Sequence, residues 1–264
     1  METLSLVYYS PTGTTKEVVR AIGQNLGLKL ISENDIAENK IESISRISDN
    51  CLTIIGMPVY SGRLPEPAIE SLKRLQSNQS PAIIVVVYGN RDYEDSLLEL
   101  KEIAGNCGFK VIAGGAFIGE HSYSTHKMPL AKNRPDKQDL EKCRDFARRI
   151  TEKLKNIKDT DLLSEPELPG NYPYKERKLL PSSIHPETDA ELCTLCRVCA
   201  DLCPTNAITI EGSVSTNGEL CTLCCACVKY CPEDARIFDH PAVNAIRENL
   251  FLNSSVRKEP VYFV

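Results

Sequence analysis

The chain has 264 residues, a formal net charge of −5 and a sequence pI of about 5.5, which argues against a nucleic-acid partner. Its length suits two domains, and its hydrophobic and charged fractions of 42% and 25% are ordinary for a globular protein. No apolar run is long enough to span a membrane, and the first residues lack the basic start and apolar core of a signal peptide. We therefore expect a cytoplasmic protein without a membrane span.

Residues 1–155 alternate short apolar runs with amphipathic stretches. The apolar runs are rich in β-branched residues and end at Gly, Pro or Ser, which is typical of buried parallel strands. The predicted strands lie at 4–9, 29–31, 51–55, 82–87 and 111–117. Helical patterns lie between and after them, at 16–26, 67–75, 95–104 and 140–154. This alternation predicts an α/β fold with a doubly wound parallel sheet.

The loops at the carboxyl ends of these strands are the candidate site, because ligands of open parallel sheets bind there. The first loop, Ser10-Pro-Thr-Gly-Thr-Thr15, offers hydroxyls and backbone N–H groups at the start of a helix, which suits a phosphate. It is neither a Gly-x-Gly-x-x-Gly motif nor a Walker loop. The alternative is a Ser/Thr-rich helix cap without a ligand.

Two later loops each carry a tyrosine at the end of a strand, among glycines and an arginine. Their sequences are Pro58-Val-Tyr-Ser-Gly-Arg63 and Tyr88-Gly-Asn-Arg-Asp-Tyr93. Two aromatic faces above a phosphate loop can hold a flat heterocycle between them. The alternative is that the tyrosines only cover the end of the sheet.

Together these three loops make residues 1–155 resemble a flavodoxin, because Ser10-x-Thr-Gly-x-Thr15 matches the flavodoxin phosphate loop. The resemblance implies a five-stranded sheet in the order 2-1-3-4-5 and an FMN bound without a covalent bond. It also implies that Tyr60 and Tyr93 stack on the flavin ring. The FMN-binding residues predicted in this way are Ser10, Thr12, Gly13, Thr14, Thr15, Pro58, Val59, Tyr60, Gly62, Arg63, Tyr88, Gly89, Asn90 and Tyr93.

The sequence departs from flavodoxins in the surroundings expected for the flavin. It contains no tryptophan, and its two tyrosine loops hold Arg63 and Arg91. A cation near the reduced flavin would favour the anion and raise its potential. The redox range of flavodoxins is therefore not carried over to this chain.

Residues 156–186 follow, with five prolines and few apolar residues. Such a stretch is neither a helix nor a central strand, so we predict a semi-rigid linker.

The cysteines are concentrated after this linker. Nine of the twelve lie between Cys193 and Cys231, and clustered thiols in a reducing compartment usually bind metal. Two runs, at 193–204 and 221–232, share the pattern Cys-x2-Cys-x2-Cys-x3-Cys-Pro with an offset of 28 residues. This is the spacing of bacterial two-cluster ferredoxins, which residues 187–240 resemble as a small α+β domain.

In such a run three cysteines bind one cube, and the fourth leaves with the chain and reaches the other cube. We therefore expect two 4Fe–4S clusters with crossed ligands. The first set is Cys193, Cys196, Cys199 and Cys231, and the second set is Cys221, Cys224, Cys227 and Cys203. Zinc or disulfides are the alternatives, but a zinc ion has no use for the third cysteine and the proline of a run. Cys225 is off the spacing and is expected to be a buried neighbour.

Residues 241–264 are expected to form a helix and a short apolar segment that packs on one domain. The whole layout resembles the flavodoxin–ferredoxin fusion proteins of anaerobic bacteria and archaea. The resemblance implies an electron-transfer protein that passes electrons between FMN and the clusters, and on to redox partner proteins.

Two other functions stay open. One is a reductase that acts on a small molecule at the FMN while the clusters supply electrons. Its proton-donor candidates are only His121 and His126, so we predict no catalytic residue and favour a carrier over a turnover enzyme. The other is a docking module in which residues 1–155 no longer bind FMN.

Overall fold

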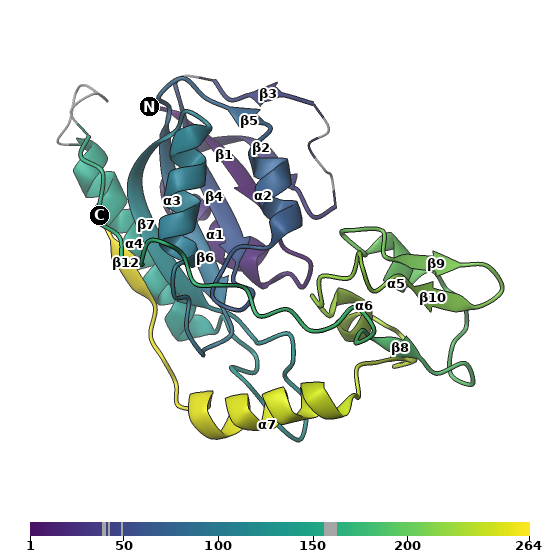
Figure 1. Ribbon diagram of the computed structural model, residues 1–264. Coiled ribbons are helices and arrows are strands. Elements are labelled where there is room, and N and C mark those ends of the chain that lie inside the picture. Colours follow the sequence, from purple (N-terminus) through teal and green to yellow (C-terminus); the bar gives the residue numbers. More distant parts are fainter. Residues whose placement is uncertain (39–40, 42, 49, 156–162) are drawn as a thin grey trace.

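The computed structural model describes residues 1–38, 41, 43–48, 50–155 and 163–264. The first residues of the predicted linker, 156–162, lie outside this part. Residues 1–155, here called the sheet region, form five parallel strands with helices on both faces, and a strand near the end of the chain adds a sixth to this sheet. Residues 187–240 form the cluster region beside it (Figure 1). Among the described residues, no helix has the length and apolar character needed to cross a bilayer.

The sheet has the strand order β12-β7-β6-β4-β1-β2. Its parallel strands are β1 (Thr3–Tyr8), β2 (Lys29–Asp35), β4 (Cys51–Pro58), β6 (Pro81–Tyr88) and β7 (Lys110–Ile118). Counted by themselves, these strands have the order 2-1-3-4-5, which is the flavodoxin-like order. The predicted fold is therefore confirmed.

Helices cover the two faces of the sheet in pairs (Figure 1). These helices are α1 (Thr14–Gln24), α2 (Glu66–Leu72), α3 (Ser96–Asn106) and α4 (Lys137–Lys155). One apolar core joins α1 and α4 to the sheet through residues such as Val19, Ile54 and Phe146. The other joins α2 and α3 to the opposite face through residues such as Leu72 and Leu100. Because both faces are covered, β4 and β6 are buried almost throughout and read as continuous apolar runs.

The cluster region is a small α+β unit in which the sequence repeat is visible in the backbone. Its elements are β8 (Glu187–Thr188), α5 (Val198–Asp201), β9 (Ile208–Ile210), β10 (Val214–Thr216), α6 (Ala226–Lys229) and β11 (Arg236–Ile237). β9 pairs with β10 and β8 with β11, both antiparallel. A residue with positive φ precedes each short helix, Arg197 at 69° and Cys225 at 60°. The two runs therefore turn in the same way.

Before the cluster region, the described part of residues 163–186 lies against the sheet region. Leu168 packs on the core beneath α3. Asp95 accepts hydrogen bonds from the backbone N–H groups of Asn171, at 2.8 Å, and Lys175, at 2.7 Å. This contact holds the chain along the sheet region before it enters the cluster region.

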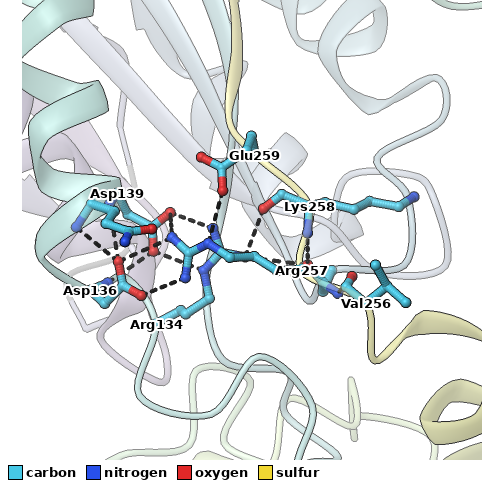
Figure 2. Close-up of polar contacts among 9 residues, drawn as sticks. Arg134, Asp136, Asp139, Val256, Arg257, Lys258 and Glu259 are labelled. Atoms are coloured by element: carbon cyan, nitrogen blue, oxygen red, sulfur yellow. Dashed lines mark hydrogen bonds and ion pairs between the residues drawn. The ribbon is translucent and has the colours of Figure 1, made fainter.

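After the cluster region, α7 (Pro241–Ser254) leads back to the sheet, and β12 (Val261–Phe263) pairs antiparallel with β7 (Figure 1). Figure 2 shows the polar contacts on the way: Arg134 forms a buried ion pair with Asp139 and donates to the backbone oxygen of Lys258 at 2.9 Å. Arg257 pairs with Asp136 at 2.6 Å.

A short parallel pair, β3 (Ser45–Arg46) and β5 (Leu75–Gln76), completes the fold. The boundaries given for the domains, linker and tail stay predictions.

Candidate redox centres

The first of two cysteine-lined cavities in the cluster region lies near solvent. The cysteines that line it are Cys193, Cys196, Cys199 and Cys231. Cys196 is exposed, and the neighbouring Leu195 is 41% exposed. A group held here would therefore be close to the surface.

The second cavity is lined by more deeply buried cysteines. The cysteines of the second predicted set line it: Cys203, Cys221, Cys224 and Cys227. Cys225 lines it too, and Cys224 and Cys227 are buried. Each cavity thus takes three cysteines from one run and its fourth from the other, which is the grouping that crossed ligation requires.

The donor set of both cavities fits iron–sulfur cubes, since each contains the four thiols of one predicted ligand set. In the part of the chain that the structure describes, no three His, Cys, Asp or Glu side chains stand close enough to hold one metal ion. Burial raises the pKa of Cys224 to about 12, so this thiol binds iron only as its proton is released.

The loop after β1 presents free donors at the start of α1. Gly13 precedes the helix with φ of +84° and gives it no side-chain cap. The Ser10 hydroxyl accepts a hydrogen bond from the Lys16 N–H at 2.9 Å. Within the described ranges, no acceptor faces the N–H groups of Thr14 and Thr15. These unpaired donors fit a phosphate group.

The tyrosines of the two loops have different neighbours in the structure. Tyr60 closes a tight turn through a bridge to Arg63. Tyr93 lies beside Tyr88, with ring centroids 5.5 Å apart. One cavity is lined by Tyr88 and Tyr93, by neighbouring loop residues, and by parts of 169–175 and 258–261. Tyr60 and the phosphate loop do not line this cavity.

Some predicted flavin contacts have other partners in the structure. The Asn90 side chain is buried, and its amide nitrogen donates to the backbone oxygens of Ser254 at 2.6 Å and Val256 at 2.8 Å. Arg63 pairs with Glu99 at 2.6 Å and Arg91 pairs with Glu94 at 2.9 Å. Asn90 thus holds the segment after α7. The carboxylates of Glu99 and Glu94 offset the positive charges of the two arginines, which the sequence analysis expects near the flavin.

The phosphate loop touches the cluster region directly. The Lys229 Nζ donates to the backbone oxygen of Thr12 at 3.2 Å. A Cβ placed on Gly13 would lie 3.1 Å from the Tyr230 hydroxyl. Lys229 and Tyr230 immediately precede Cys231, a lining residue of the first cavity.

Tyrosines form the boundary between the sheet region and the second cavity. Burial raises the pKa of Tyr9 and of Tyr60, and in both cases the Cys224 thiol nearby adds to the rise. The Tyr123 ring meets the Phe238 ring edge-on, with centroids 5.6 Å apart. Sequence reasoning missed Tyr9, Tyr123 and Tyr230 as boundary residues, although Tyr9 and Tyr230 directly adjoin predicted site positions.

The comparisons with known proteins agree with this division of the chain. A family described as a 4Fe-4S binding domain matches residues 186–209, which include the first cysteine run. No curated protein matches the chain.

Several solved structures resemble it at low identity. A flavodoxin from the domain Archaea is 16% identical with a TM-score of 0.39, over 58% of this chain and 99% of its own. Flavodoxin 1 from Bacillus cereus is 18% identical with a TM-score of 0.41, over 57% and 98%. A rubredoxin oxygen:oxidoreductase from the anaerobe Desulfovibrio gigas is 15% identical with a TM-score of 0.41, over 59% of this chain and 37% of its own.

At such values the fold assignment rests on the strand order, not on these likenesses. The chain joins a sheet with the flavodoxin-like strand order to a segment that matches a 4Fe-4S binding domain, in the layout that the sequence predicts.

Proposed function

We propose that this chain is an electron-transfer protein that holds FMN in the sheet region and two 4Fe–4S clusters in the cluster region, and that passes electrons between them and on to redox partner proteins. The observation that carries the proposal is that Tyr123, in the loop after β7, packs in one apolar cluster with Cys225, which lines the second cavity. The carboxyl end of the sheet, where such folds bind ligands, therefore adjoins the second cysteine cavity.

The residues of the sheet region would hold the cofactor from two sides. The free N–H groups of Thr14 and Thr15 would bind the phosphate, and the ring of Tyr60 would form a wall for the flavin. Bound FMN would supply a centre that takes up two electrons and releases them singly, which suits clusters that each carry one.

The two cavities would then act in order. The second cavity, whose lining residue Cys225 packs against Tyr123 of the sheet region, would receive or return electrons there. The first cavity, with Cys196 exposed, would exchange electrons with a partner protein. We place the protein in the cytoplasm as part of the same proposal, because clustered thiols stay reduced there.

A small-molecule reductase receives less support from the residues near the site. Burial lowers the pKa of His121 to about 4, so its ring is neutral at pH 7. Its Nδ1 atom accepts a hydrogen bond from the Tyr123 N–H at 3.0 Å. His121 is therefore poorly suited to donate a proton, and His126 is exposed.

The test is anaerobic reconstitution followed by rapid mixing with a reductant. We expect about eight iron and eight sulfide per chain, one FMN, and electron exchange between flavin and clusters at a rate independent of protein concentration. Tyr60→Ala should weaken FMN binding, whereas Tyr172→Ala, at a tyrosine that is 77% exposed, is the matched control. Zinc in place of iron, or a chain that binds no FMN, would contradict the proposal.

A further inference from the structure

The repeat in the cluster region breaks at one buried position. Ile208 and Arg236 are equivalent by the 28-residue offset. Ile208 packs with Cys199 and Cys227 in an apolar cluster. Arg236 is only 4% exposed. A buried cation in place of an apolar side chain costs free energy unless negative charge compensates it.

The neighbours of Arg236 within the protein do not supply that charge. Its Nη1 donates to the Thr188 hydroxyl at 2.5 Å. Its Nη2 donates to the backbone oxygen of Pro186 at 2.8 Å and to the Thr216 hydroxyl at 2.9 Å. These acceptors are neutral, and no carboxylate pairs with Arg236 in the described part of the chain. Its Nε is buried without a hydrogen-bond partner.

Arg236 instead lies between the two cysteine cavities and lines both of them. Its Nη2 is 3.8 Å from the Cys227 Sγ of the second set. A cube bound by four thiolates carries net negative charge, so loading the cavities places that charge on two sides of Arg236.

We propose that Arg236 is the shared counter-charge of the two clusters and raises the reduction potential of both. This inference rests on the proposed function, because it requires two loaded clusters. Adding an electron makes a cluster more negative, so a nearby cation stabilises the reduced state more than the oxidised state. Since Arg236 is buried, solvent and salt screen this effect only weakly.

The test compares neutral variants at this position with a surface control. Arg236→Gln and Arg236→Met remove the charge and keep much of the side-chain volume. Arg236→Lys keeps the charge. Arg197→Gln is the control, since Arg197 lines only the first cavity and its side chain is 61% exposed. The midpoint potentials of both clusters are measured in the full reconstituted chain by redox titration followed by EPR.

We expect both neutral variants to lower both potentials. A tenfold fall in the equilibrium constant for reduction, equal to about 59 mV for a one-electron couple, is the expected order of the shift. Arg236→Lys should stay near the wild-type potentials. Arg197→Gln should move the first cluster much less and the second not at all.

Unchanged potentials in the neutral variants, or a shift confined to one cluster, would overturn the proposal. If both neutral variants lose iron, Arg236→Lys decides: two clusters at wild-type potentials support a role for the charge, whereas iron loss or lowered potentials in this variant overturn it. A wild-type chain that binds fewer than two clusters would instead contradict the proposed function, before any variant is compared.

Discussion

The sheet region and the cluster region are stabilised in different ways. Apolar side chains from four helices and the parallel strands bury both faces of the sheet. The cluster region has two small groups of buried residues, and two of the three residues in one of them are Cys199 and Cys227. A region with so little apolar core usually needs a metal or disulfides to stay folded. The sheet region should therefore fold without cofactors, while the cluster region should depend on iron.

Removing iron should have the largest effect. After anaerobic chelation, backbone amides of the cluster region should exchange with solvent nearly as in an unfolded chain, because its folding free energy depends on the metal. Amides of β4 and β6 should stay protected. Hydrogen exchange read by mass spectrometry measures both regions in one sample. Equal protection of the cluster region with and without iron would show that its folding does not depend on the metal.

Crossed ligation predicts which of the two clusters is damaged when the fourth cysteine of a run is replaced. Cys203→Ala should damage the cluster held by the second run, and Cys231→Ala should damage the cluster held by the first run. Each variant should lose up to about four iron, although a 3Fe form can remain. Iron analysis and EPR of the two clusters measure the outcome.

The control for these variants lies inside the second run. Cys225→Ala should keep all its iron, since Cys225 is off the ligand spacing although it lines the second cavity. Damage to the cluster encoded by the mutated run itself would contradict crossed ligation.

Lowering the pH should reduce the folding stability of the sheet region through His121. The pKa of His121 is about 4 in the folded chain, below the ordinary 6.5, because the ring is buried. Only the unfolded chain takes up the proton between these values, so stability falls as pH drops from about 6.5 towards 4. At pH 5 the loss should be at most about 2 kcal/mol.

Urea unfolding of the sheet region at pH 7 and pH 5 measures this loss. His121→Gln should unfold with a smaller difference between the two pH values than the wild-type chain. The same pH dependence in both proteins would show that another group is responsible.

The smallest effects concern FMN affinity. Tyr60→Ala and Tyr93→Ala should each weaken binding by about 1 kcal/mol, or roughly fivefold, through lost stacking. Thr12→Ala should weaken it to a similar extent through lost phosphate contacts. Titration by flavin fluorescence measures all three. A loss in Tyr60→Ala without one in Tyr93→Ala would place the flavin beside the loop after β4 and away from the loop after β6.

Most of the fold could be predicted because the strands at the centre of the sheet are buried on both faces. Their apolar runs are therefore unbroken in the sequence, as in Pro81–Tyr88. The strand β12 could not be predicted, since Val261–Phe263 is short and its partner β7 lies far away in the chain. The apolar pattern predicts that Leu75 lies in a helix, but Leu75 begins β5, which pairs with β3. Both strands have only two residues, so neither leaves a periodic pattern in the sequence.

The part of the candidate site that could be predicted from the sequence is the part defined by the spacing of the cysteines. The cysteine pattern leads to the two groups that the cavities contain. The positions of Tyr9 and Tyr123 depend on contacts between distant segments, which no local pattern records. The resemblance to flavodoxins predicts that Asn90 binds FMN. In the structure its side-chain amide instead donates to backbone oxygens at the end of α7 and just after it.

The pairing of β12 with β7 has a consequence for synthesis of the chain. The parallel strands leave the ribosome first, whereas β12 follows the whole cluster region. The edge of β7 thus stays without its antiparallel partner while more than a hundred further residues are made. An open edge can pair with another chain, and nascent domains expose such edges before they are complete. Prompt docking of α7 and β12 after their synthesis would shorten this exposure.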